Sequence, residues 1–171
     1  MQGFVFALIA VGAFNTVIAT LLTLVGYGGG FVEITNTSIA GLSLEGVAVV
    51  LVNGGDSLEY DRVALTGSLV AHGHLLIPVE AQNGAPDGVA LVDTTSGLLL
   101  DSLSYEGEIT AAIIDAQTFD LTEGTPLEAA DSNTVTGSLS RIPDGEDRND
   151  SGTDWEFTTT VTPGAANVAS G

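Results

Sequence analysis

The stretch that decides the fold is VAVVLVNGGDSLEYDRVAL, residues 47–65. Its first half is a short, continuous apolar run of the kind found in fully buried strands. Asn53-Gly54 then supplies the positive φ angles that a tight hairpin turn requires. From Leu58 to Asp61, apolar and acidic side chains alternate, as they do in a strand with two different faces. The stretch therefore predicts a β-hairpin.

Further short apolar runs lie on both sides of this hairpin, separated by turn residues. They are residues 31–35, 74–79, 88–93, 98–107, 138–142 and 155–161. Pro78 places the end of one run at a sheet edge or a bulge, because proline cannot donate a ladder hydrogen bond. Short strands with frequent Gly and Asn turns are typical of a β-sandwich or barrel. We therefore expect an all-β domain over residues 31–171, with a less regular stretch from 109 to 130.

The N-terminal segment has a different character. Residues 4–25 read FVFALIAVGAFNTVIATLLTLV, without a charged side chain. As a helix this segment would be about 33 Å long, enough to cross a bilayer. We expect residues 1–26 to form a hydrophobic, helical assembly or anchor segment, joined to the domain by a glycine hinge at residues 27–30. The β-branched content of the segment leaves strands of the sheet as the alternative.

A helix over residues 4–25 would have one face of small residues and one of large apolar residues. Small residues three and four apart allow helix backbones to approach closely. No basic residue flanks the segment, as a signal peptide or the cytoplasmic end of a membrane anchor would require. Burial against copies of itself is therefore favoured, with a membrane as the alternative partner. The candidate assembly residues are Gly12, Thr16, Thr20 and Thr23 on the small face, and Phe4, Leu8, Phe14, Ile18 and Leu22 on the other.

Composition excludes several classes of function. The chain of 171 residues has 22 Asp plus Glu against 3 Lys plus Arg, which gives a net charge of −19. Nucleic acid is excluded as a partner, because neutralising phosphates takes clustered basic side chains. Cysteine is absent, which excludes disulfides and thiol chemistry. An acidic, lysine-free surface suits a high-salt, halophilic setting because salt screens self-repulsion; simple solubility is the alternative explanation.

The order of motifs after residue 31 resembles the lamin-tail domain of prokaryotic exported proteins. The most specific motif is SLSRIPDGEDRNDSGTDWEFTTTVTPGAAN, residues 138–167, which has a Ser-Leu-x-Arg strand, an acidic loop, an aromatic strand and a closing Thr-Pro-Gly-x-x-Asn. The weaker motifs are FVEITN (31–36), LSLEGVAVVLVNG (42–54), APDGVALVD (85–93) and LLLDSLSYEG (98–107). The resemblance implies an immunoglobulin-like β-sandwich that serves as a binding or structural module and has no catalytic residues of its own. That family usually begins with a strand that carries an Asn-Glu pair, followed by a polar loop, whereas the corresponding region here is apolar and has only Asn15 in common with that pattern.

One acidic loop, from Asp144 to Asp154, carries candidate metal ligands. Calcium is bound by about six to eight oxygen atoms, which a flexible acidic loop can supply. The spacing does not match an EF-hand, and a solvated acidic turn is the alternative. No other cofactor is expected. The candidate calcium ligands are Asp144, Glu146, Asp147, Asn149, Asp150 and Asp154.

Other polar residues point to structure rather than catalysis. His72 and His74 would share one face of a strand, but no third metal ligand is close in sequence, so a polar face or a turn is favoured. We expect Arg141 to form an ion pair across the end of the sandwich. Trp155 and Phe157 are expected in the core. No nucleophile or phosphate-loop motif is present, and we expect no enzyme activity.

Two functions follow as expectations. The first is a non-catalytic subunit of an extracellular filament or surface assembly that associates with itself through its apolar N-terminus. An apolar helix joined by glycines to a β domain is similar in architecture to archaeal pilins and archaellins. The second is a membrane-anchored or secreted lamin-tail-like binding module that accompanies an exported enzyme.

Overall fold

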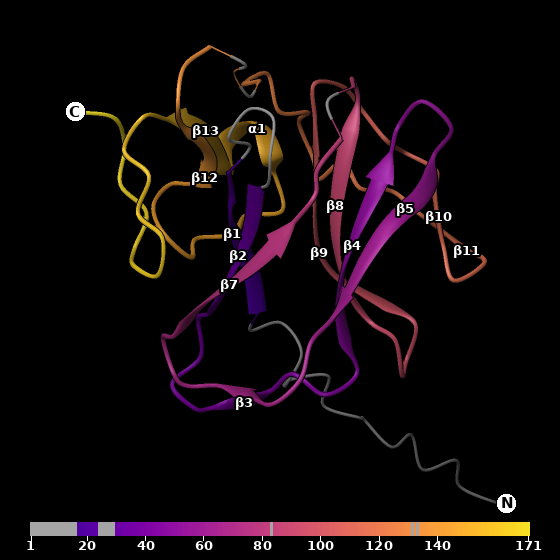
Figure 1. The fold of residues 1–171 in the computed structure, drawn as a ribbon, viewed down its shortest axis with the longest axis horizontal. Helices are drawn as coiled ribbons and strands as arrows, with labels where there is room; N and C mark the ends of the chain where they lie inside the picture. Colours follow the sequence, from indigo (N-terminus) through magenta and orange to yellow (C-terminus); the bar gives the residue numbers. More distant parts are fainter. Residues whose placement is uncertain (1–16, 24–29, 83, 131, 133) are drawn as a thin grey trace, which may run out of the picture.

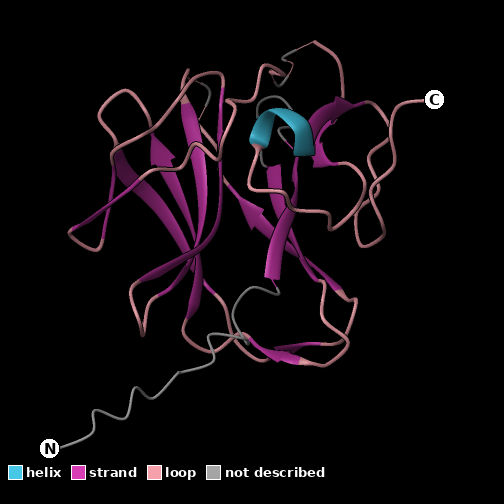
Figure 2. Ribbon diagram, turned by 180° about the vertical axis from the view of Figure 1, so that it is seen from behind, coloured by secondary structure: helices cyan, strands magenta, loops and turns pink. Residues whose placement is uncertain are grey.

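A computed structural model describes residues 17–23, 30–82, 84–130, 132 and 134–171, with no side-chain description before residue 30. Most of the secondary structure is β, arranged as two facing sheets (Figures 1 and 2). The five-stranded sheet has the order β13-β12-β1-β2-β7, and the six-stranded sheet has the order β11-β10-β5-β4-β8-β9. A short pair, β3 with β6, lies at one end.

The bounds of the elements follow the chain. The first seven strands are β1 (Val17–Thr23), β2 (Gly30–Asn36), β3 (Leu42–Ser43), β4 (Val47–Asn53), β5 (Leu58–Ala64), β6 (Ser68–Leu69) and β7 (His74–Val79). The remaining elements are β8 (Asp87–Asp93), β9 (Leu98–Tyr105), β10 (Ala112–Ile114), β11 (Gln117–Phe119), β12 (Ser138–Arg141), α1 (Ser151–Asp154) and β13 (Trp155–Thr158).

The predicted hairpin is confirmed as β4 paired antiparallel with β5. Strand β4 is apolar from Val47 to Val52, and both of its faces are buried there. Val49 and Leu51 face the core between the sheets, while Val50 and Val52 pack in a second apolar cluster with Ile109 on the outer side of the six-stranded sheet. The stretch after residue 109, expected to be irregular, forms β10 and β11 and covers this outer side.

The expected helix is wrong for residues 17–23. These residues form β1, which pairs antiparallel with β2 on one side and with β12 on the other. The strand supplies backbone partners to both neighbours, whose facing N–H and C=O groups would otherwise stay unpaired. The β-branched content of this stretch was the sequence signal for a strand.

The assembly residues are affected by this correction. Ile18, Thr20, Leu22 and Thr23 lie in β1 and therefore not on the two faces of a helix. The other assembly residues, Phe4, Leu8, Gly12, Phe14 and Thr16, lie outside the described residues, as does most of the predicted hinge. Gly30, the last hinge residue, begins β2.

Three residues lie where the sequence predicts them: Trp155 and Phe157 in the core, and Pro78 at a sheet edge. Trp155 is 4% exposed in the core, and Phe157 packs against it partly buried. Pro78 lies in β7, which is the edge strand of the five-stranded sheet, as its missing N–H predicts. The cis peptide before Pro143 begins the acidic loop that carries much of the candidate site.

Candidate functional site

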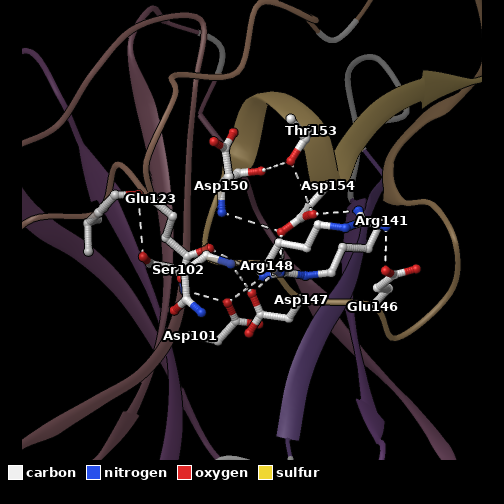
Figure 3. Close-up of polar contacts among 12 residues, drawn as sticks. Asp101, Ser102, Glu123, Arg141, Glu146, Asp147, Arg148, Asp150, Thr153 and Asp154 are labelled. Atoms are coloured by element: carbon white, nitrogen blue, oxygen red, sulfur yellow. Dashed lines mark hydrogen bonds and ion pairs between the residues drawn. The ribbon is translucent and has the colours of Figure 1, made fainter.

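Arg141 is the centre of the largest charge network among the described residues (Figure 3). Its side chain is 0% exposed, and its Nη2 lies 2.6 Å from Oδ1 of Asp101. Since Arg141 is in β12 and Asp101 is in β9, this ion pair joins the two sheets. The expected ion pair across the sandwich is confirmed. The guanidinium carbon also lies 4.9 Å from the ring centroid of Trp155, within cation–π range.

Arg141 also lies close to two acidic residues of the 144–154 loop and to one from the segment after β11. Its Nη1 lies 3.0 Å from Oδ1 of Asp147 and 3.3 Å from Oδ2 of Asp154. Its Nη2 lies 3.5 Å from Oε2 of Glu123, which comes from the segment after β11. Four carboxylates around one guanidinium leave an excess of negative charge in a buried place. The loop is therefore held in position by a charge that belongs to the sheet.

Arg148 neutralises part of this excess of negative charge. Its backbone N–H donates to Oδ2 of Asp154 at 2.7 Å, and its Nη1 donates to Oδ1 of the same carboxylate at 2.9 Å. Its Nη2 also pairs with Glu146. Asp154 is thus held by both arginines and is fully buried, while Arg148 lies at the surface.

Two acids of this network, the partly buried Glu123 and the fully buried Asp154, have pKa values shifted in opposite directions. Burial raises the pKa of Glu123, and the nearby Asp147 and Asp154 add to the rise, against the attraction of Arg141. Burial also acts to raise the pKa of Asp154, but hydrogen bonds from the backbone and side chain of Arg148 outweigh it, so that the pKa of Asp154 is lowered. Asp154 is therefore the carboxylate that the fold stabilises in its charged form.

The candidate calcium ligands do not surround one point. Asp147 and Asp154 face Arg141, and Glu146 faces Arg148. The other three are engaged elsewhere: Asp144 accepts from the N–H of Asn167, Asp150 accepts from the hydroxyl of Thr125, and Asn149 donates its N–H to Asp147. Within the part of the chain that the structure describes, no three His, Cys, Asp or Glu residues are placed to hold a metal ion.

A second polar cluster lies on the outer face of the five-stranded sheet, around His74 of β7. Its Nδ1 lies 2.9 Å from Oγ1 of Thr35 and 3.5 Å from Oε1 of Glu33. Its Nε2 lies 4.0 Å from Oδ2 of Asp144, at the start of the acidic loop. Glu33 is fully buried, and burial raises its pKa against hydrogen bonding from Gly164 and the attraction of His74.

The C-terminal segment closes over this face. The N–H of Gly164 donates to Oε2 of Glu33 at 2.5 Å, and the N–H of Asn167 donates to Oδ1 of Asp144 at 3.1 Å. The side chain of Asn167 also donates to the carbonyl oxygen of Arg141 at 3.3 Å. The closing Thr-Pro-Gly-x-x-Asn motif is thereby tied to both polar clusters.

A pocket of roughly 440 Å³ opens beside His74. It is lined by Thr35, Thr37, His72, His74, Asp144, Gly145 and Ala166. Both histidines of the chain therefore lie at one pocket. His72 lies before β7 in a turn with φ of 53°, one of the two roles favoured from the sequence, and therefore does not share a strand face with His74. Glu33 was not predicted as a site residue; its signal in the sequence is a lone charge inside an apolar strand.

No helix among the described residues combines the length and the apolar character needed to span a bilayer. Comparison with known proteins gives no match to a family model, to a curated protein or to a solved structure.

Proposed function

We propose that this chain is a non-catalytic, lamin-tail-like binding module with an immunoglobulin-like sandwich, acting outside the cell or at its surface. The observation that carries this proposal is the network of Arg141. The Ser-Leu-x-Arg motif, the acidic loop and the closing Asn, which together make the resemblance specific, meet at this one buried arginine. The residues of the motif thus stabilise the fold, which supports the proposal of a binding module with a rigid surface.

The placement of β1 favours this proposal over a pilin-like one. A helix packed in a filament core needs a long apolar segment free of the sandwich, and β1 takes residues 17–23 into a sheet. Strand β1 also supplies the first strand that the resemblance to lamin-tail domains calls for, although its sequence is apolar.

A second candidate function is a self-assembling surface subunit. It is favoured by residues 4–16, which are uncharged and precede β1. Such a segment, apolar apart from Asn15 and Thr16, is suited to burial in a membrane or against copies of itself. The two candidates make different predictions about the free protein.

The first prediction concerns association. As a binding module, the full chain should sediment as a discrete species and show single particles, not fibres, in negative-stain microscopy. If fibres form, a variant lacking residues 1–16 is the matched control, because it keeps β1 and every strand after it. Fibres that disappear in this variant would favour the surface subunit and contradict the binding module.

The second prediction concerns cations. Thermal stability should rise with NaCl, since the charge of −19 repels itself less as the Debye length falls from about 30 Å at 0.01 M to about 3 Å at 1 M. Calcium should stabilise no more than magnesium at matched ionic strength, because Asp147 and Asp154 already face arginines. A much larger effect of calcium in a differential scanning experiment would instead support a specific site in the 144–154 loop.

A further inference from the structure

In the pocket beside His74, Nε2 of His74 and Oδ2 of Asp144 lie 4.0 Å apart. Of the two neutral tautomers of the imidazole, the one with its proton on Nδ1 directs that proton toward Thr35 and toward Oε1 of Glu33 at 3.5 Å. Thr35 Oγ1, at 2.9 Å from Nδ1, can accept that proton's hydrogen bond. In this form Nε2 is an acceptor, and Oδ2 of Asp144 at 4.0 Å is an acceptor too.

A donor nitrogen fits between these two acceptors. A nitrogen about 2.8 to 3.0 Å from each, the ordinary hydrogen-bond distance, can bridge two atoms that are 4.0 Å apart. The angle at that nitrogen is then about 84 to 91°, narrower than the tetrahedral angle, so an ammonium group would bind both acceptors through two slightly bent hydrogen bonds. The hydroxyl oxygen of Thr37, in the same pocket wall, is of the right type for a third N–H.

The charge of the pocket favours a cation. Glu33 and Asp144 are on either side of His74, and no arginine lines the pocket. The three arginines of the chain pair with other carboxylates: Arg62 with Glu59 and Asp115, Arg148 with Glu146 and Asp154, and Arg141 within its buried network. The wider field of a chain with a charge of −19 also attracts cations.

The geometry favours an ammonium over a guanidinium group. A guanidinium pairs best with both oxygens of a carboxylate at once. In Asp144 the Oδ1 atom already accepts from the N–H of Asn167 at 3.1 Å, which leaves Oδ2 toward His74. A compact ammonium needs only one oxygen from each acceptor group.

We propose that this pocket binds a primary ammonium group between Nε2 of His74 and Oδ2 of Asp144. The inference rests on the proposed function as a binding module and names the chemistry of its partner. The same group can come from a lysine side chain of a partner polypeptide or from a free alkylamine.

Protonation of His74 competes with this ligand. A proton on Nε2 removes the acceptor and allows His74 to pair with Asp144 directly. The titratable groups that face His74 are Glu33 from β2, Asp144 from the acidic loop and His72 from the turn before β7. The ammonium should therefore bind the neutral form of His74 and not its protonated form.

The test uses the full chain and four probes in a buffer with EDTA: a lysine dipeptide, its Nζ-acetylated form, the matching arginine dipeptide, and n-butylamine. Binding is followed by the NMR signals of the His74 and His72 rings and by calorimetry. We expect the lysine dipeptide and n-butylamine to shift the His74 ring signals, the arginine dipeptide to bind more weakly, and the acetylated dipeptide to have no effect. Binding of the lysine dipeptide alone would assign the site to a polypeptide, whereas equal binding of n-butylamine would assign it to free amines.

Two variants make the test specific. Asp144→Asn should weaken ammonium binding about tenfold or more, since a charge-assisted hydrogen bond is lost. Asp56→Asn, at an exposed turn between β4 and β5, is the matched control and should bind as the parent chain does. If Asp144→Asn does not fold, the loss of binding on acidification of the parent chain remains the deciding measurement.

The inference is overturned if no ammonium probe shifts the His74 signals, or if the acetylated dipeptide binds equally well. That outcome, with single particles in the microscope, leaves the proposed binding module standing without this ligand. Fibres from the full chain contradict the binding module instead and do not depend on the ammonium titration. The two failures are therefore distinguishable.

Discussion

Replacing Arg141 with methionine should lower the free energy of unfolding by about 3 to 5 kcal/mol, the usual cost of leaving buried charges without their partner. The side chains of Asp101 and Asp154 are 1% and 0% exposed, so water cannot take the place of the guanidinium. The substitution leaves these two carboxylates, with Glu123 and Asp147, facing one another. Urea unfolding followed by the fluorescence of Trp155, the single tryptophan, measures the change.

Arg62→Met is the matched control for this experiment. Arg62 also pairs with two carboxylates, Glu59 and Asp115, but its side chain is 26% exposed. An exposed pair of this kind contributes about 0 to 1 kcal/mol, so the control should stay close to the parent chain. Equal losses in the two variants would contradict the central role of Arg141.

Arg141→Lys separates charge from shape. Lysine keeps the positive charge but cannot reach four carboxylates through a planar fork. We expect a stability between those of the parent chain and the methionine variant. A lysine variant as stable as the parent would mean that charge alone holds the two sheets together.

Much of the β architecture was predictable because its signals are local. The turn at Asn53-Gly54, the buried run of β4 and the proline at the edge strand β7 each act over a few residues. The ion pair of Arg141 was also predictable in kind, since one of only three basic residues in so acidic a chain must find a carboxylate. Its partner Asp101 was not, because the packing of the two sheets that brings β9 close to β12 is a long-range property.

The error over residues 17–23 has a physical origin. An uncharged apolar run fits a buried strand as well as a buried helix, and the length of the run favours a helix. The sheet has a position for one more strand between β2 and β12, and this position is defined only once both of those strands are in place. Similarly, the sequence of the acidic loop predicts calcium ligands but does not show that Arg141 and Arg148 face into the loop.

Asp154→Asn should make the chain less stable at neutral pH by about 2 to 4 kcal/mol, because the buried Arg141 and the N–H groups of Arg148 lose a charged acceptor. The loss should shrink on acidification. The pKa of Asp154 is lowered in the folded chain from its usual 3.8, so its contribution is fully present above pH 3.8 and disappears as the pH falls through the folded pKa.

Two other acids change the stability in the opposite sense as the pH falls, and the experiment must separate their effect from that of Asp154. The pKa values of Glu33 and Glu123 are raised by burial, so these two groups cost stability when they ionise and return it as the pH falls. The difference in unfolding free energy between the parent chain and Asp154→Asn at each pH cancels the effect of Glu33 and only part of that of Glu123, because Asp154 itself helps to raise the pKa of Glu123. Urea titrations from neutral pH to below pH 3.8 should show this difference narrowing, while Asp56→Asn stays parallel to the parent. A difference that stays constant down to the lowest pH would mean that the Asp154 charge contributes nothing and that only its shape matters in the network.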